Sequence, residues 1–324
     1  MTYNKTLLGR FVATGYPVAT MLFVSFLLWV AGALRGVGCA ETLASAAGIS
    51  FVGDTVARIL SLVAFLATAL VLNHIYIFER RVPFLMPLFL WFAAAFVFLH
   101  ADYVASLSLV PFILTVAQLF YSCGEQGDVR SLFGAFAMLS FASLFLLQFA
   151  FLLLPLLLFV ALSRGNGVRE FFVAILGVAA PFWLLFGTVF VFPQLDWLLL
   201  PLKIGWVNLV TPATITLSQP MYAVLAVEVL VWVMAVCFFF TSSSLAKPLL
   251  RRRLLFVILL NLFLWLLSWV VQQDFFLLLA WRLPGTAIMA SYVFAAKVTR
   301  LTNIYFIVLN VMLIIISACC LWIG

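Results

Sequence analysis

Residues 171–192 read FFVAILGVAAPFWLLFGTVFVF, and this unbroken apolar stretch decides the class of fold. The hydrocarbon core of a bilayer is about 30 Å thick, and about 20 helical residues, rising about 1.5 Å each, cross it. The stretch is long enough to do so and contains no charged side chain. A transmembrane β-strand would alternate between lipid-facing and lumen-facing residues, so the continuous run favours a helix.

The rest of the chain has the same apolar character. Of its 324 residues, 67% are hydrophobic and only 8% are charged, whereas soluble domains are usually about 45 to 50% apolar. The composition therefore excludes a soluble globular domain. The net charge is +7, but Lys and Arg occur in ones to threes and form no basic face, which argues against nucleic acid as a partner.

Apolar runs between charged residues predict an all-α, polytopic bundle of transmembrane helices that forms a single integral membrane domain over residues 1–324. The candidate segments are residues 11–33, 56–77, 82–99, 103–121, 131–162, 171–192, 221–240, 254–271, 275–295 and 304–322. The run 131–162 is too long for one untilted span and short for two. If it forms a hairpin and 103–121 crosses, the chain has eleven spans; if it is one long span and 103–121 a half-helix, the chain has nine.

The placement of Lys and Arg predicts the orientation, because short loops rich in these residues stay cytoplasmic. With the amino terminus inside, twelve of the seventeen fall on the cytoplasmic side. These twelve are Lys5, Arg10, Arg80, Arg81, Arg164, Arg169, Lys247, Arg251, Arg252, Arg253, Lys297 and Arg300. We therefore expect a multi-pass protein of the cell inner membrane, in contact with membrane lipids, with a cytoplasmic amino terminus.

The motifs of several enzyme classes are missing from the sequence. It contains no Walker A run, HExxH, GxSxG, Rossmann glycine pattern or CxxC pair. Its two histidines exclude a metal site built from several histidines. We therefore expect no cofactor and no metal, and chemistry that rests on carboxylates and arginines, with a carboxylate-bridged metal as the one metal alternative.

Most of the remaining charged residues are predicted to lie outside or near the outer boundary, so we expect any polar cavity to open outward. Asp54 and Arg58 are four residues apart, so on a helix they share one face. Either Asp54 acts as a base and Arg58 binds a phosphate, or the two form a local salt bridge. His100 and Asp102 are two apart, so only a turn brings them together, and anchoring at the interface is their alternative role. Candidate catalytic residues are Glu41 and Asp54; candidate substrate-binding residues are Arg35, Arg58, His100, Asp102, Asp196, Lys203, Glu228 and Arg282.

Glu228 lies eight residues into an apolar segment, where an ionised carboxylate is costly. We expect it to face the bundle interior, either protonated or paired with a cation from another helix such as Arg58 or Arg282. It would serve as a proton or cation relay or as a structural hydrogen-bond partner. The sequence Arg282-Leu-Pro-Gly285 interrupts a later segment, and we expect unwound backbone there, covered by protein or water.

Three stretches carry a resemblance to a known family. They are NHIYIFERRVPFLMP at 73–87, SLFGAFAMLSFASLF at 131–145, and Arg169-Glu-Phe-Phe172 followed by Gly177 and Pro181. These stretches resemble an uncharacterised family of polytopic inner-membrane proteins from Bacteroidota. The segment 283–297 is similar in layout to the last helices of that family. This resemblance implies a helical membrane fold and assigns no catalytic residues.

A weaker likeness is to polyprenyl-phosphate-dependent membrane glycosyltransferases and O-antigen polymerases, through the apolar run that closes on Arg164 and Arg169. It implies a protein that handles a lipid-linked sugar or polyprenyl phosphate at the outer leaflet. Glu41 or Asp54 would be the general base, and Arg35, Arg58 and Arg282 would stabilise the pyrophosphate. The paired-acid motif of that class is absent, so enzyme activity stays open. The alternatives are a transporter with a polar site near Glu228 and a non-catalytic subunit that binds a membrane protein partner in an envelope assembly.

Overall fold

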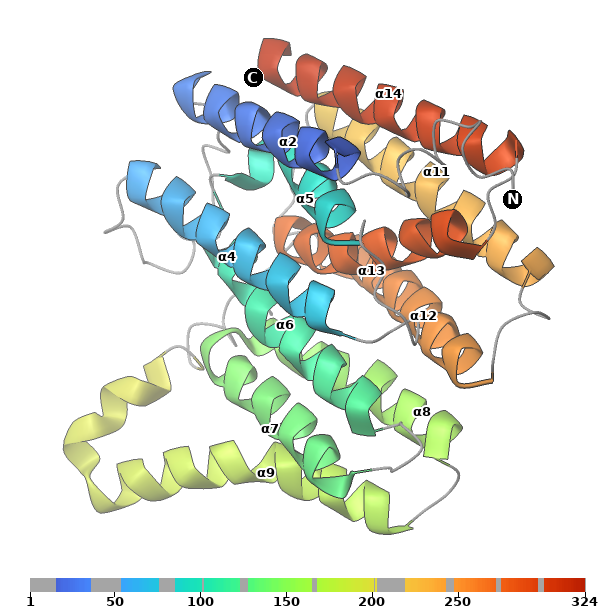
Figure 1. The fold of residues 1–324 in the computed structure, drawn as a ribbon. Coiled ribbons are helices and arrows are strands. Elements are labelled where there is room, and N and C mark those ends of the chain that lie inside the picture. The colour runs from blue at the N-terminus through green and yellow to red at the C-terminus, as the bar shows by residue number, and fades with distance from the viewer. Residues whose placement is uncertain are drawn as a thin grey trace. The chain divides into compact units, whose positions relative to one another are not determined.

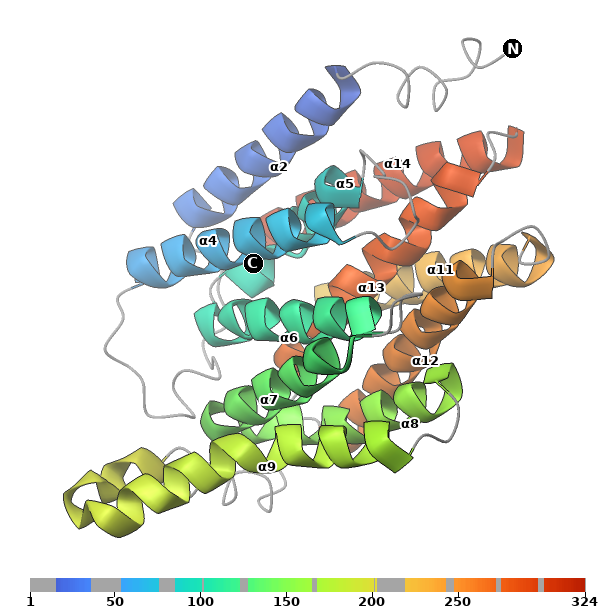
Figure 2. The same cartoon turned by 60° about the horizontal axis from the view of Figure 1, so that its bottom comes forward.

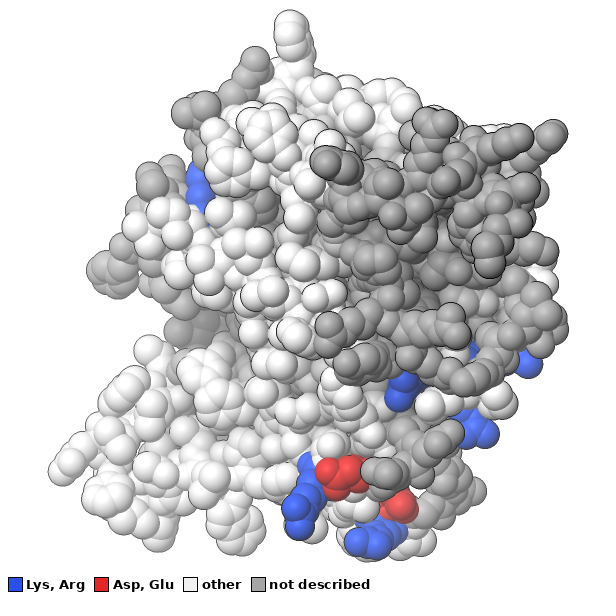
Figure 3. Space-filling model, in the orientation of Figure 1, with Lys and Arg blue, Asp and Glu red and all other residues white. Residues whose placement is uncertain are grey.

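The computed structural model describes residues 16–35, 54–75, 85–100, 102–122, 128–164, 168–200, 202, 219–242, 248–271, 275–296 and 300–323. Over these residues all regular secondary structure is helical, as the sequence predicts. Six of the described helices are long and apolar enough to cross a membrane, as a multi-pass membrane protein requires. Most described side chains on the face drawn in Figure 3 are uncharged. The count of nine to eleven spans and the cytoplasmic amino terminus stay predictions.

The chain forms two compact units. Unit 1 consists of Met1–Leu109, Ile215–Trp265 and Asp274–Gly324, and unit 2 of Val110–Thr214 and Leu266–Gln273. Two helices, α6 (Tyr103–Ser122) and α12 (Pro248–Val270), contribute residues to both units. The single integral membrane domain stays a prediction, and each unit is described separately below.

Unit 1 is organised around the short helix α5 (Leu85–Ala95). Its sequence LMPLFLWFAAA has no polar face, and a helix that is apolar on all sides is stable only when other elements surround it. Accordingly ten of its eleven residues are buried. It contacts α2 (Tyr16–Arg35), α4 (Asp54–His74), α13 (Phe275–Ala296) and α14 (Arg300–Ile323), and Figure 1 shows it among them.

The segment 82–99 is not one long helix. The chain leaves the α-helical conformation at Phe96 and continues as the 3-10 helix η2 (Val97–His100), which contacts α2, α4 and α14. Helix α11 (Gln219–Ser242) completes unit 1 and contacts α13 and α14. Figure 2 gives a second view of these helices.

Unit 2 contains the run 131–162, which forms α7 (Val129–Phe145), the 3-10 helix η3 (Leu147–Leu152) and α8 (Leu153–Arg164). The run therefore is not the single long helix required by the nine-span alternative, because Leu146 is extended, with φ −132° and ψ 102°. Pro155 explains part of this break: it has no N–H, so it fits the first turn of α8 but not the interior of a continuous helix.

The helices α7 and α9 (Val168–Val191) of unit 2 approach each other closely. A Cβ atom at Gly177 of α9 would lie 2.8 Å from the backbone oxygen of Phe133 and 2.9 Å from the Cβ of Phe136. Only glycine permits this approach. Ser140 of α7 also donates a hydrogen bond of 2.6 Å to the carbonyl oxygen of Val178.

The remainder of α9 is highly exposed. Only 11% of its apolar window is buried, and Trp183 and Phe190 are 79% and 87% exposed. After α9 the chain continues as the 3-10 helix η4 (Pro193–Leu199). A soluble protein rarely exposes so much large apolar surface, so this helix supports a membrane environment.

Candidate functional site

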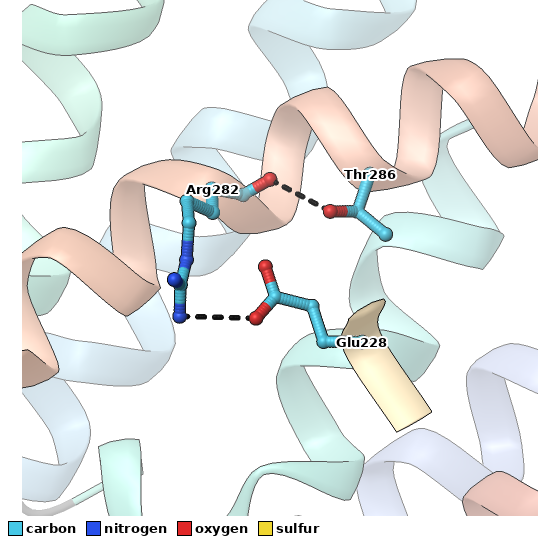
Figure 4. Close-up of polar contacts among 3 residues, drawn as sticks. All are labelled: Glu228, Arg282 and Thr286. Carbon is cyan, nitrogen blue, oxygen red and sulfur yellow. Dashed lines mark hydrogen bonds and ion pairs between the residues drawn. The ribbon is translucent and has the colours of Figure 1, made fainter. Parts of the chain in front are cut away.

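The candidate site is built around an ion pair between two helices of unit 1. Glu228 projects from α11 and Arg282 from α13, and Figure 4 shows the two side chains pointing toward each other. Arg282 Nη2 lies 3.0 Å from Glu228 Oε2. The two residues are only 1% and 3% exposed, so the pair is enclosed by protein.

Pairing is what makes two ionised groups tolerable at this depth. A charge taken out of water costs several kcal/mol unless an opposite charge lies close by. The interior position of Glu228 and its pairing with a cation on another helix are therefore confirmed, and the partner is Arg282. Arg282 lies seven residues after Phe275, inside a candidate span and not at its outer boundary as we expected.

The backbone around Arg282 is regular helix, so the expected unwinding at Pro284 and Gly285 is wrong. Helix α13 runs without interruption from Phe275 to Ala296. Pro284 removes only one hydrogen bond of the helix, and the apolar window of α13 is buried along its whole length, so packing holds it in place. Thr286 Oγ1 donates a 3.1 Å hydrogen bond to the carbonyl oxygen of Arg282, and Figure 4 shows this contact.

Helix α11 is also held from α14. The hydroxyl of Tyr305 donates a 3.1 Å hydrogen bond to the carbonyl oxygen of Val231, one turn after Glu228. This bond joins residues 74 positions apart in the chain. The carboxylate therefore sits on a helix that contacts both α13 and α14.

A cavity of about 150 Å³ adjoins the ion pair. Three helices contribute its lining, which consists of Glu228, Val229 and Trp232 from α11, Asn261, Leu262 and Trp265 from α12, and Arg282 from α13. Glu228 and Trp232 are four residues apart, as are Asn261 and Trp265, so each pair shares one helix face. All seven residues belong to unit 1.

The amide of Asn261 packs against α13 at Gly285. A Cβ atom at Gly285 would lie 2.7 Å from Asn261 Nδ2 and closer still to Oδ1. Glycine at this position therefore lets the amide lie against the α13 backbone, beside the cavity. The Pro-Gly sequence thus allows a close contact between helices within a regular helix.

Two polar groups of the cavity have no hydrogen-bond partner among the described residues. They are Nδ2 of Asn261, which is 4% exposed, and the indole Nε1 of Trp232. Buried donors in native proteins nearly always have partners, and an exception calls for an explanation such as a bound ligand or water. Neither nitrogen is accessible from the cavity, however, and the surface that the cavity presents is almost entirely apolar.

Arg58, His100 and Asp102 form a separate polar region of unit 1. Arg58 Nη1 donates a 3.1 Å hydrogen bond to the carbonyl oxygen of Gly32. Asp102 Oδ1 accepts a 3.0 Å bond from the backbone N–H of Ala105, which caps the start of α6. None of the three residues is among the described lining of the cavity.

The ring of His100 is completely buried in this region. Its Nε2 lies 3.1 Å from the carbonyl oxygen of Ala93, and because a carbonyl can only accept, Nε2 carries the proton. The ring stacks on Trp29 of α2, with centroids 3.5 Å apart. Burial lowers the pKa of His100 to about 3; the bond to Ala93 opposes this change, and the charge of Arg58 adds to it.

The other predicted site residues do not reach the cavity or are not described. Asp196 is exposed on η4 of unit 2. Arg35 ends α2 and Asp54 begins α4, but their side chains lie outside the described residues. Glu41 and Lys203 lie wholly outside them.

Sequence reasoning missed the cavity residues Trp232, Asn261 and Trp265. One signal was present: Asn261 is the single amide in the apolar stretch 254–267, and Trp265 follows it at helical spacing. A polar side chain in such a segment marks an interior face.

No protein-family model, curated protein or solved structure matches the chain. The resemblances to membrane families therefore stay predictions, and the case for a function depends on the cavity.

Proposed function

We propose that this protein is a transporter that binds a small solute in the cavity beside Glu228 and Arg282. The observation that carries the proposal is the position of a buried ion pair beside a cavity that Glu228 and Arg282 help to line. Ionisable residues inside membrane spans are costly, and they commonly mark a substrate or ion pathway. A purely structural ion pair needs no adjoining cavity.

The ion pair gives the site a means of responding to a solute. Glu228 provides only acceptors when ionised, and Arg282 provides only donors. A solute that hydrogen-bonds to either group competes with the contact between α11 and α13. Binding is thereby coupled to the packing of two helices, as alternating access requires.

The handling of a lipid-linked sugar or polyprenyl phosphate stays a prediction that no structural observation favours. It requires Asp54, Arg58 and Arg282 to converge, but Arg58 bonds to the backbone of α2 and does not line the described cavity. The side chains of Asp54 and Glu41 are not described. The role as a non-catalytic subunit and the location in the inner membrane likewise stay predictions.

The test is flux across a lipid bilayer. The purified full-length chain is placed in phospholipid vesicles loaded with a defined mixture of sugars, amino acids, pyrimidine bases and short carboxylates. Loss of each solute is followed by mass spectrometry. We expect at least one solute to leave faster from these vesicles than from empty ones, and Glu228→Gln to lower that rate at least tenfold. Asp196→Asn is the matched control, because it also neutralises a carboxylate but on the exposed η4.

A second variant separates function from folding. In Glu228→Gln the guanidinium of Arg282 loses its counter-charge, so we expect the protein to be destabilised. The double variant Glu228→Gln/Arg282→Gln has no uncompensated charge, and we expect it to fold but to lack flux. Wild-type flux in the folded double variant, or no protein-dependent flux of any solute, would overturn the proposal.

A further inference from the structure

The accessible surface of the cavity beside the ion pair comes chiefly from apolar side chains. Its charged and amide residues, Glu228, Asn261 and Arg282, are each at most 4% exposed, and the two charged groups face each other. The other lining residues are Val229, Trp232, Leu262 and Trp265. A polar group placed against this surface would give up hydrogen bonds to water and gain none. The lining therefore favours an occupant that is apolar and uncharged.

The volume of the cavity fits a single ring. The cavity measures about 150 Å³, and an apolar cavity of this size stays free of water and can hold benzene. An unfilled space is unfavourable, because the side chains around it lose van der Waals contacts. A benzene-sized occupant restores these contacts.

The cavity is close to the lipid-facing surface of unit 1. Leu262, which lines it, is exposed, as are Leu255 and Leu259 at helical spacing on the same face of α12. On α11 the lining residue Val229 is half-buried and is followed by the exposed Leu230. Because α12 is a candidate membrane span, these exposed apolar side chains meet hydrocarbon. An occupant can therefore reach the cavity from the bilayer.

Two tryptophans favour an aromatic ring over a lipid tail as the occupant. Trp232 on α11 and Trp265 on α12 carry the largest side chains of the apolar lining. Lipid tails are as apolar as the cavity, so the hydrophobic effect does not favour their transfer into it. An aromatic ring gains stacking or edge-to-face contacts with the indoles. A rigid ring also loses less conformational freedom than a tail confined to a small space.

We infer that the cavity binds one small, uncharged aromatic ring of benzene size, which enters from the bilayer between α11 and α12. The inference goes beyond the proposed function, because this occupant makes no hydrogen bond to the ion pair. The ring and the proposed solute share one space, so the ring should inhibit flux of that solute. No covalent step is involved.

The test is fluorine NMR of the full-length protein, labelled with fluorotryptophan and placed in phospholipid nanodiscs, with toluene as the probe. Replacing each tryptophan in turn by phenylalanine assigns the signals. We expect the signals of Trp232 and Trp265 to shift with toluene until they saturate. Trp183 of α9 is 79% exposed, so its signal should shift only in proportion to the toluene dissolved in the bilayer.

Two further ligands test the chemical class. Cyclohexane has the size of the ring but no aromatic electrons, so half-saturation should require a bilayer concentration roughly twofold to tenfold higher than for toluene. Naphthalene is aromatic but has two fused rings, which exceed a space of benzene size, so it should give no saturable shift. Equal half-saturation by toluene and cyclohexane would overturn the aromatic class.

A variant that fills the cavity locates the binding. Val229→Phe adds volume to the lining and should abolish the saturable shift. Val233→Phe is the matched control, because it makes the same change one turn further along α11, at an exposed residue outside the described lining. The unfolding temperature of each variant shows whether it folds. If Val229→Phe unfolds, the comparison of toluene with cyclohexane and naphthalene in the wild type decides.

Absence of a saturable shift in the wild type, the result expected if lipid tails fill the cavity, would overturn the inference. A wild-type shift in folded Val229→Phe would do the same. Glu228-dependent flux without binding of toluene would refute this inference alone. Saturable binding of toluene without protein-dependent flux of any solute would support it and refute the proposed function.

Discussion

The helix pairs α11–α13 and α7–α9 are held together by different means. In unit 1, α11 and α13 share a buried ion pair between Glu228 and Arg282. In unit 2, α7 and α9 approach each other at Gly177, where a Cβ atom would meet the backbone of Phe133. The first pair depends on charge, and the second depends mainly on the absence of a side chain. A buried charge pair is sensitive to the loss of either partner, whereas a glycine contact is sensitive to added volume.

The same contrast appears in the exposure of the helices. All of the apolar window of α13 is buried, but only 11% of that of α9. Yet α13 is the more polar of the two: Arg282, Thr286 and Ser291 are all buried on it. Polar side chains thus mark the interior helix, as expected where the surroundings of the protein are apolar.

Removing one charge of the ion pair should have the largest effect. Glu228→Gln leaves a guanidinium that cannot lose its proton, so we expect a stability loss of about 3–5 kcal/mol. Arg282→Met should cost less, because a lone carboxylate can become neutral by binding a proton. Thermal unfolding in detergent measures both changes.

The double variant Glu228→Leu/Arg282→Met sharpens this result. Replacing a whole buried pair with apolar residues is often neutral or stabilising, so it should regain most of the loss. A loss of unfolding free energy in the double variant equal to the sum of the losses in Glu228→Leu and Arg282→Met would show that the two charges do not stabilise each other.

Acid should weaken unit 1 through His100. Its pKa is about 3 in the folded protein, against an ordinary value of 6.5, so the unfolded chain binds the proton more readily between these values. The stabilisation is complete above pH 6.5 and is lost as the pH falls toward 3. At about 1.4 kcal/mol per pH unit, the loss amounts to about 3 kcal/mol at pH 4.

His100→Phe provides the control for this pH dependence, because it keeps an aromatic ring beside Trp29 without a titratable group. Unfolding is measured from pH 7 to pH 4 for both proteins. If the free energy of unfolding falls equally with pH in both proteins, His100 is not buried in the neutral form.

Gly177→Ala should break the contact between α7 and α9. The new Cβ atom meets a backbone oxygen at 2.8 Å, and backbone cannot turn away as a side chain can. We expect a loss of about 1–3 kcal/mol in thermal unfolding, as for other overpacked sites.

Tyr305→Phe tests the other support of α11. It removes the hydrogen bond to Val231 and leaves a buried carbonyl oxygen without that donor. A loss of about 1 kcal/mol is expected from urea unfolding. An unchanged free energy of unfolding would show that α11 is held by α13 alone.

Gly187→Ala should have the smallest effect, with the opposite sign. Gly187 lies on the same helix as Gly177, but an added Cβ atom meets nothing within 4 Å. Alanine favours a helix interior over glycine, so a gain of about 0.5–1 kcal/mol is expected. Similar losses at both glycines would contradict the exposure of this end of α9.

Much of the helical architecture could be predicted from sequence, because long apolar runs leave few alternatives to a helix in a bilayer. The segments 171–192 and 275–295 correspond closely to α9 and α13. The effects of prolines could not be predicted. Pro155 lies in the first turn of a new helix and Pro284 lies inside a regular one, and packing from distant segments decides between these outcomes.

Only part of the candidate site could be predicted from the sequence. Glu228 and Arg282 stand out because ions are rare in apolar runs. Asn261 belongs to the site because α12 brings its amide against Gly285 of α13, and Trp232 belongs to it because α11 lines the same cavity. Helix contacts of this kind depend on tertiary packing, which the spacing of residues within one helix does not reveal.

The complete enclosure of α13 also bears on how this chain can diverge over evolution. Substitutions should accumulate readily along α9, where one large apolar residue can replace another with little effect on neighbouring side chains. Along α13 most replacements require a compensating change elsewhere, above all at Arg282 and Gly285. Distant homologues should therefore be recognisable first by their α11 and α13 sequences.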